Sequence, residues 1–457
     1  MNSTSLFILA FILLVISFKK PFVGIFIILV FSTRIFYLIE MTELPTIKLS
    51  GVGDVQLFDL FLGILLIVSI AKIKRRQQEI AFKNIYVWLI ILVSVNFLFS
   101  LFSVNFELRG ALNSIRKLFS YSFYFVLIAN IRNKDDITKL IKVIYTILII
   151  AITIQFYEVI SGTKIILINR VELRPYWDVS PEITLASGEQ VLYIWNRAAV
   201  LTYLGLFLAF GYIFTNTIIV NLSKNINKLI FVLGLTAFFL ALTRSWLLYI
   251  TFGFFITILF AKKHKKKFIL ITLGLSVTFL IINQTIEIFT SGTINISQNL
   301  IGRVLTIFDV FKGENDSFNV RLAVYANQIA LFLQNPFFGY GFTKTAISEI
   351  NGDVGVGNTL LQFGLFGLSW VLSIIWSIYN KLIFIKRNIS DFYSNGISLG
   401  LLGAFSGMLL GYFFNWDFFG RIDGIIVVAT IMAIIDRTIN LEKLSHQLTE
   451  KQPQPIT

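Results

Sequence analysis

Several arginines stand in apolar surroundings, where a charged side chain is costly. Arg197 lies in "YIWNRAAVLTYLG", Arg244 in "ALTRSWLLY" and Arg321 in "SFNVRLAVYANQ". Ionisable groups within membrane segments cost about 2.5–3.5 kcal/mol each on insertion scales and often mark functional sites. A guanidinium group stays charged and donates paired hydrogen bonds that match phosphate oxygens. These residues predict a site for a phosphorylated substrate, and the alternative is that they anchor helix ends at the membrane surface.

A glycine-rich turn follows the last of these arginines in the stretch "NPFFGYGF" (335–342). Pro336 stops a helix because it lacks the N–H group that the next helical turn needs. Gly339 and Gly341 allow backbone angles that other residues resist. The stretch therefore predicts a turn of defined shape, in which the glycines are structural and the aromatic side chains are available to a ligand.

The turn is flanked by two predicted helices. The run 317–336 has apolar residues at helical spacing and predicts an amphipathic helix that carries Arg321. A further apolar run, "NTLLQFGLFGLSW", begins at Asn358. The turn is expected to bring Arg321 and the segment from Asp353 to Asn358 over one cavity, with Asp353, Arg321 and Asn358 as candidate catalytic residues.

The composition predicts the class of protein that positions these residues. The chain has 457 residues, a mean hydropathy of +0.79 and only 14% charged residues, against about 25% in typical soluble domains. Apolar runs long enough to cross a bilayer about 30 Å thick recur from end to end, which predicts an all-α polytopic membrane protein with about 12 or 13 spans. The runs lie near 4–18, 21–39, 53–71, 84–104, 113–130, 138–158, 190–214, 227–242, 246–261, 268–285, 356–379, 394–415 and 421–436.

The net charge of +14 has a topological explanation. Lysine clusters occupy alternate connections, and the positive-inside rule places all of them in the cytoplasm without conflict. We therefore predict the lipid bilayer as a partner and no nucleic acid. The clusters are "KK" (19–20), "KIKRR" (72–76), "RNKDD" (132–136), "KNINK" (224–228), "KKHKKK" (262–267), "KLIFIKR" (381–387) and the C-terminal tail (438–457).

Two connections are long, and both fall outside the cytoplasm in this topology. The first, 159–189, carries Arg170 and Arg174, and the second, 286–355, contains the amphipathic helix and the glycine-rich turn. Long loops in compact folds are usually functional. Residues 1–457 are thus expected to form one integral membrane domain with two extracytoplasmic loops. Arg170, Arg174 and Tyr340 join the candidate substrate-binding residues, and the alternative for Tyr340 is a place in the aromatic belt at the membrane surface.

An ordered set of motifs resembles a known family. Arg321, "NPFFGYGF" and "GNTLLQFGLFG" follow the "TRS" turn (243–245) and Arg197 in the order seen in the O-antigen ligase and O-antigen polymerase (Wzy-like) family. The resemblance covers about 190–380 by motif and the whole chain by hydropathy. It implies transfer of glycans from undecaprenyl pyrophosphate at the outer face of the bacterial cytoplasmic membrane. Partners that this role implies are the lipid-linked glycan, a chain-length regulator and a flippase.

The resemblance also suggests roles for single residues. Arg197, Arg244 and Arg321 match positions that hold the pyrophosphate, and Asn358 matches the second member of a His-Asn pair. Where the ligases have histidine, this chain has Gly357. The two histidines of the chain, His264 and His446, fall in cytoplasmic segments, so a repeat-unit polymerase is favoured over a ligase.

The implied chemistry is attack of an acceptor sugar hydroxyl on C1 of the donor glycan. Stabilising the charge of the departing pyrophosphate is expected to contribute most, and arginines can do this without metal or cofactor. For the general base, Asp353 is the first choice, with Glu349 and Asp178 as alternatives. Three other functions stay open: a ligase that uses another acceptor, a polysaccharide flippase or transporter, and a non-enzymatic scaffold. The absence of internal repeats in the sequence disfavours the transporter.

Overall fold

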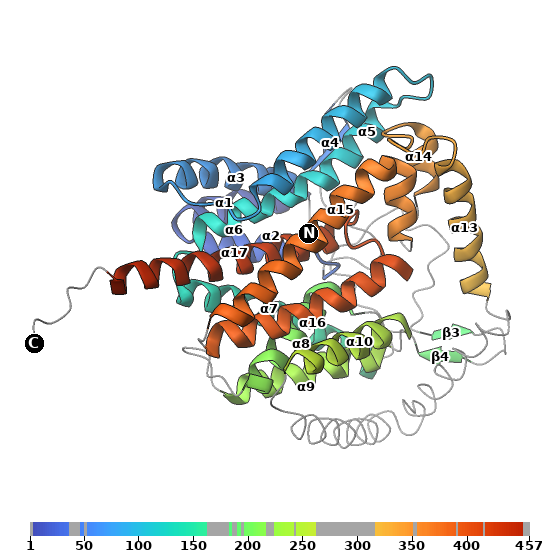
Figure 1. The fold of residues 1–457 in the computed structure, drawn as a ribbon. Helices are drawn as coiled ribbons and strands as arrows, with labels where there is room; N and C mark the ends of the chain where they lie inside the picture. Colours follow the sequence, from blue (N-terminus) through green and yellow to red (C-terminus); the bar gives the residue numbers. More distant parts are fainter. Residues whose placement is uncertain are drawn as a thin grey trace, which may run out of the picture.

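The computed structural model describes residues 3–35, 46–49, 53–161, 182–184, 190–192, 196–215, 224–241, 244–261, 316–350, 354–389, 392–414 and 416–450. Helices dominate these residues (Figure 1). They are α1 (Ser3–Lys19), α2 (Pro21–Phe31), α3 (Leu57–Arg76), α4 (Lys83–Leu101), α5 (Leu108–Phe119), α6 (Phe123–Asn130), α7 (Lys134–Ser161), α8 (Ala199–Thr215), α9 (Lys224–Ala241), α10 (Arg244–Phe260), α13 (Asp316–Phe332), α14 (Lys344–Glu349), α15 (Gly355–Asn388), α16 (Phe392–Phe414) and α17 (Ile422–Glu450). Two short antiparallel hairpins pair β1 (Thr46–Leu49) with β2 (Gly53–Gln56) and β3 (Glu182–Thr184) with β4 (Gln190–Leu192).

Within the described residues, four helices are long and apolar enough to cross a membrane: α4, α7, α15 and nearly all of α16. Four shorter apolar helices accompany them, in α2, α8, α9 and α10. The prediction of an all-α polytopic membrane protein is confirmed, with the two hairpins as the small exceptions. The predicted span 268–285 lies outside the described residues, so the total of 12 or 13 spans stays a prediction.

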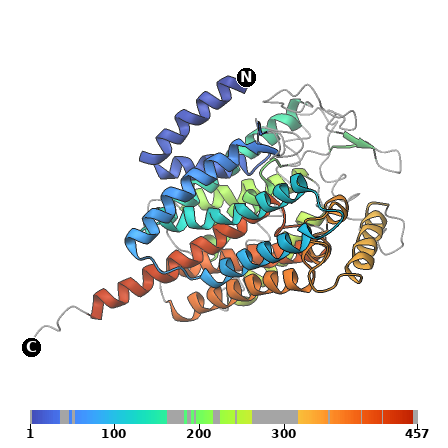
Figure 2. The same ribbon diagram turned by 90° about the horizontal axis from the view of Figure 1, so that it is seen from above.

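The helices form one bundle in which α16 packs against α8, α10 and α15. Small residues allow the close approach of α8 and α16: a Cβ added at Gly400 would lie 2.5 Å from the Phe207 carbonyl oxygen. Figures 1 and 2 agree that α13 and the β3–β4 hairpin lie at one end of the bundle. The C-terminal end of α17 leaves from the opposite end.

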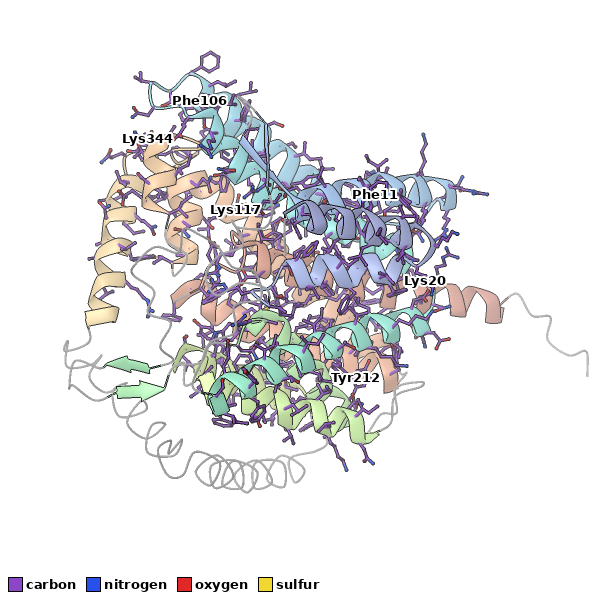
Figure 3. The ribbon with its side chains drawn as sticks, turned by 180° about the vertical axis from the view of Figure 1, so that it is seen from behind. Phe11, Lys20, Phe106, Lys117, Tyr212 and Lys344 are labelled. Carbon is purple, nitrogen blue, oxygen red and sulfur yellow. The ribbon has the colours of Figure 1, made fainter. Side chains whose placement is uncertain are left out.

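Basic connections gather at the end where α17 leaves the bundle. Lys72 donates to Asn130 Oδ1 at 2.9 Å, and the Lys134 ammonium lies 2.8 Å from Glu442. Figure 3 shows Lys20 at this same end and Lys344 at the other. This gathering agrees with the positive-inside argument, and which end faces the cytoplasm remains a prediction.

Some predicted boundaries are wrong. The span 190–214 begins as a helix only at Ala199, because residues 190–192 form β4. Just before the helix, Asn196 Oδ1 accepts from the Ala198 N–H at 3.0 Å and from the Thr202 hydroxyl at 3.1 Å. The predicted span 53–71 begins as a helix only at Leu57, because residues 53–56 form strand β2. A 3₁₀ turn at Ser120–Ser122 divides the predicted span 113–130 into α5 and α6. The predicted amphipathic helix 317–336 is present as α13 but ends at Phe332.

Helix α15 is interrupted at Gly364, where φ is 60° and ψ is −154°. In a regular helix the N–H groups of Leu365 and Phe366 would donate to the carbonyls of Leu361 and Gln362. The break separates these partners. Two N–H groups and two carbonyl oxygens therefore need other hydrogen bonds.

The turn 335–342 supplies all four of these hydrogen bonds. The carbonyl oxygens of Pro336 and Phe337 accept from the two freed N–H groups at 2.8 and 3.0 Å. The N–H groups of Tyr340 and Gly341 donate to the two freed carbonyls at 2.8 and 2.7 Å. The glycine-rich turn and the broken helix are thus one backbone unit, which we call the splice.

Glycine is required at the splice by both conformation and space. Gly339, Gly341 and Gly364 have φ values of 65°, 59° and 60°. A Cβ at Gly339 would lie 2.6 Å from the Leu361 carbonyl oxygen, and one at Gly364 would lie 2.5 Å from that of Phe337. The prediction that the turn glycines are structural is confirmed. The sequence did not reveal that Gly364 breaks the following helix.

Replacing Gly364 by alanine is expected to destabilise the fold. A side chain in this backbone region costs about 1–3 kcal/mol, and the contact with the Phe337 carbonyl adds to that cost. The measurement is the thermal unfolding midpoint of the purified protein in detergent. Gly63→Ala is the matched control, because Gly63 lies within α3 with no atom within 4 Å of an added Cβ. An unchanged midpoint for Gly364→Ala would contradict the role of the splice.

Candidate active site

A buried chain of polar side chains begins on α13. Gln328 is fully buried, and its Nε2 donates to the carbonyl oxygen of Glu349 at 2.8 Å and to Asn358 Oδ1 at 2.9 Å. Because both partners of this nitrogen are oxygen acceptors, the orientation of the Gln328 amide is defined. The contact joins α13 to the first turn of α15, directly before the splice.

Asn358 extends this chain to the connection between α16 and α17. Its Nδ2 donates to Asp417 Oδ2 at 2.9 Å, while the N–H of Gly420 donates to Asp417 Oδ1 at 2.8 Å. We call this set the Gln328–Asn358–Asp417 chain. It brings together three elements that are far apart in the sequence.

A cavity of about 40 Å³ lies against this chain. Asp417 is the only carboxylate among the described residues that line it. Gln362, which also lines the cavity, has a buried Nε2 with no hydrogen-bond partner in the described part of the chain. A hydroxyl group can accept from this amide, so a polyhydroxylated ligand suits the cavity. The lining residues are Ser114, Lys117, Leu118, Ile350, Asn358, Thr359, Gln362, Phe363, Trp370, Val371, Asp417, Phe419 and Gly420.

The Asp417 carboxyl group has an unusual affinity for protons. It lies in the connection between two helices, yet only 5% of the residue is exposed. Burial raises the pKa of Asp417 to about 6, although hydrogen bonds from Asn358 and Gly420 and the charges of Lys117 and Arg421 oppose the rise. The group is therefore largely ionised at neutral pH and can still take up a proton.

Sequence reasoning missed both ends of this chain. Asp417 belongs to "NWDFFGRID" (415–423), a short connection that carries three charged residues between apolar spans. That density of charge in a minimal loop was the available signal. Gln328 is one of three side-chain amides in α13, seven residues after Arg321, and nothing in the sequence distinguishes it or identifies its partner.

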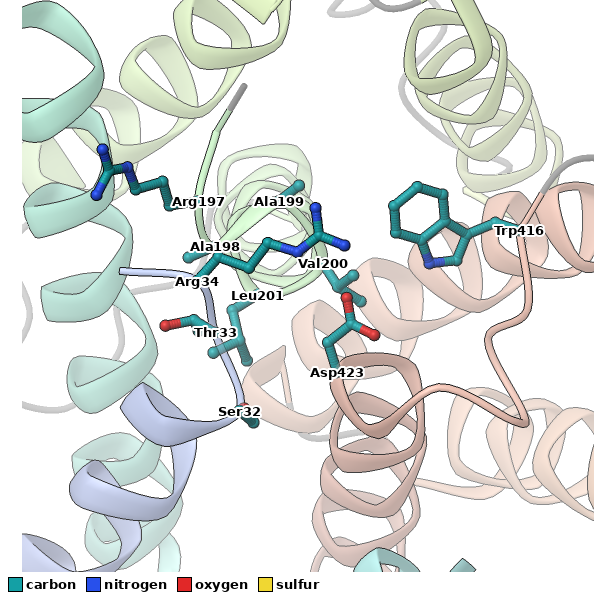
Figure 4. A pocket seen from close by; sticks show the side chains of 10 residues that line it. All are labelled: Ser32, Thr33, Arg34, Arg197, Ala198, Ala199, Val200, Leu201, Trp416 and Asp423. Atoms are coloured by element: carbon teal, nitrogen blue, oxygen red, sulfur yellow. The ribbon is translucent and has the colours of Figure 1, made fainter. Parts of the chain in front are cut away.

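Arg197 is one of the residues that line a second, smaller cavity of about 10 Å³ (Figure 4). Its guanidinium pairs with Glu158 of α7 and donates to the Ile35 carbonyl oxygen at 3.2 Å. Arg34, Trp416 and Asp423 also line this cavity. Trp416 is the chain neighbour of Asp417, so consecutive residues of one connection line the two cavities.

The other predicted site residues are only partly brought together. Arg321 is half-buried and lies on α13 seven residues from Gln328, which is two helical turns or about 10 Å along the same face. The Tyr340 hydroxyl donates to Gln334 Oε1 at 2.7 Å, and Glu349 Oε2 accepts from Asn327 at 2.8 Å. Arg244 begins α10, and its side chain is outside the described residues, as are Arg170, Arg174, Asp178 and Asp353.

The packing around position 357 explains why this protein has glycine there. A Cβ added there would overlap Gln328 Oε1 and would lie 2.8 Å from Val354 Cγ1. The Gln328 amide therefore occupies the space into which a side chain at 357 would extend. A histidine at this position would require Gln328 to leave its two hydrogen bonds.

The fold and this site define a multi-pass membrane protein with a buried polar site at the end of the bundle away from the basic connections. Residues 229–372 match a family model described as O-Antigen ligase. This part of the chain is thus similar to the O-antigen ligase domain family of membrane glycan polymerases and ligases, whose members transfer lipid-linked glycans. No curated protein matches the sequence.

Removing one partner of the buried Arg197–Glu158 pair tests whether it is structural. Arg197→Met removes the cation paired with the buried Glu158 carboxylate and is expected to cost about 3–5 kcal/mol. The double variant Arg197→Met with Glu158→Leu removes both charges and should recover most of that loss. Unfolding midpoints in detergent measure both effects. A single variant as stable as the wild type would contradict the structural role.

Proposed function

We propose that the protein polymerises lipid-linked oligosaccharide repeat units of an O-antigen, capsule or exopolysaccharide. In this reaction the glycan on undecaprenyl pyrophosphate is transferred to a sugar hydroxyl of an acceptor unit at the outer face of the bacterial cytoplasmic membrane. The observation that carries the proposal is the Gln328–Asn358–Asp417 chain. Two of its three members lie within the region matched by the family model, beside a cavity whose lining residue Gln362 has an amide nitrogen with no partner among the described residues.

Arginines around this end of the bundle suit the leaving group. Charge develops on the pyrophosphate as its bond to the sugar breaks, and fixed cations that stabilise this charge contribute strongly to the rate. Arg321 on α13 and Arg244 at the start of α10 are the proposed pyrophosphate ligands, with Arg170 and Arg174 in the loop 159–189. Arg197 belongs to the same proposal, although its pairing with Glu158 makes its contribution partly structural.

A ligase that transfers the glycan to another acceptor is the second candidate. The family match is compatible with both activities. Gly357 favours the polymerase, because the space in which the resembling ligases carry a histidine is filled here by the Gln328 amide. The two functions differ in product: a polymerase extends the glycan, and a ligase attaches it.

Deletion of the gene followed by electrophoresis of the surface glycan tests the proposal. Loss of a polymerase leaves single repeat units on the final acceptor, because attachment continues without extension. Loss of a ligase leaves none attached, and loss of a flippase strands the units inside the cell. A glycan pattern unchanged by the deletion would contradict the proposed function.

In the deletion strain, Arg321→Ala is expected to lower polymer formation about 100-fold, the usual effect of removing a donor that stabilises a developing anion. Arg109→Ala is the matched control, because Arg109 is an exposed arginine of α5 that does not line the cavity. The amount of each variant in the membrane is measured alongside. Full-length polymer from Arg321→Ala would remove this residue from the site.

A further inference from the structure

Transfer of a glycan to a hydroxyl group requires a group that takes the hydroxyl proton. The acceptor oxygen forms a bond to C1 of the donor sugar, and the bond from C1 to the pyrophosphate oxygen breaks with its electron pair on the lipid pyrophosphate. The hydroxyl proton must leave the new glycosidic oxygen. A base positioned at the acceptor hydroxyl typically contributes 10²–10⁴-fold to the rate.

We infer that Asp417 is the general base that accepts the proton of the attacking hydroxyl, and that Asn358 holds its carboxylate in place; the inference rests on the proposed function. Asp417 is the only acid among the described residues lining the cavity. Its two oxygens are fixed by the Asn358 amide and the Gly420 N–H, and each keeps a lone pair for a proton. The carboxylate is thus fixed before substrate arrives.

The walls of the cavity indicate how the acceptor is oriented. Gln362 Nε2, on the wall of the cavity, lacks an acceptor among the described residues. A sugar ring offers neighbouring hydroxyls, so one hydroxyl can accept from Gln362 while another reaches Asp417. The cavity of about 40 Å³ admits a hydroxyl or hydroxymethyl group but not a whole sugar ring, so the ring lies at its mouth.

Charged and titratable groups around Asp417 set the pH at which it works. Lys117 of α5 and Arg421 favour the ionised form, and the phenols of Tyr121 in the 3₁₀ turn and Tyr412 in α16 face it. Burial outweighs the cations and raises the pKa of Asp417 to about 6. Protonation blocks a base, so activity is present above this pKa and is lost as the pH falls through about 6.

The experiment measures the initial rate of polymer growth between pH 5 and pH 8. It uses membranes of the producing strain that carry the endogenous lipid-linked repeat units and each full-length variant in place of the wild type. The wild type should lose activity below about pH 6. Asp417→Asn should lower the rate at least 100-fold at pH 7.5, and Asp417→Glu should retain a measurable part of it. Asn358→Ala removes a hydrogen-bond donor to the ionised carboxylate, which should raise the pKa of Asp417. The loss of activity at low pH, which forms the acidic limb of the pH–rate profile, should therefore move to higher pH.

Asp353→Asn and Glu349→Gln are the comparison variants, because these acids are two of the three candidate bases expected from the sequence. Both should keep the acidic limb near pH 6. The inference is overturned if Asp417→Asn, present in the membrane at the wild-type level, polymerises at the wild-type rate. It is also overturned if Asp353→Asn or Glu349→Gln abolishes the limb. If the strain lacking the gene still makes polymer of normal length, the proposed function itself fails.

Discussion

Four backbone hydrogen bonds between the turn 335–342 and the interruption of α15 are the constraint on which the site depends. A break in an apolar helix exposes N–H and carbonyl groups, and each unpaired group in such surroundings costs several kcal/mol. The turn pairs all four. Because Pro336 and Gly341 are fixed to α15 in this way, the helix that ends just before the turn is fixed as well, and Gln328 is held beside Asn358.

The second constraint is the short connection between α16 and α17. It places Trp416 against the cavity of Arg197 and Asp417 against Asn358. The aromatic packing of Trp416 with Trp246, at a centroid distance of 5.7 Å, ties this connection to α10. Arg421 lies over the Trp416 ring at 4.1 Å, which keeps a cation close to the buried carboxylate. The polar chain is therefore supported by rigid helices on both sides.

The parts of this arrangement that sequence could predict are those encoded locally. The glycine-rich turn, the amphipathic helix that carries Arg321 and the helix that opens at Asn358 all follow from residue type and spacing. The break at Gly364 could not be predicted, because the apolar run "QFGLFGLSW" continues through it without a change in pattern. Asp417 and Glu158 were missed for another reason: their partners Asn358 and Arg197 are 59 and 39 residues away, and one sequence does not reveal such pairings.

The central claim is that the end of the bundle bearing α13, the splice and the Gln328–Asn358–Asp417 chain faces the outside of the cell. The protein contains no cysteine, so a single introduced cysteine is the only thiol that a maleimide can label. Lys344 lies at this end of the bundle and Lys443 at the other, and both side chains are exposed. Lys344→Cys and Lys443→Cys therefore report on the two ends. With a membrane-impermeant maleimide on intact cells, we expect labelling of Lys344→Cys, and of Lys443→Cys only after permeabilisation. The reverse pattern would contradict the account.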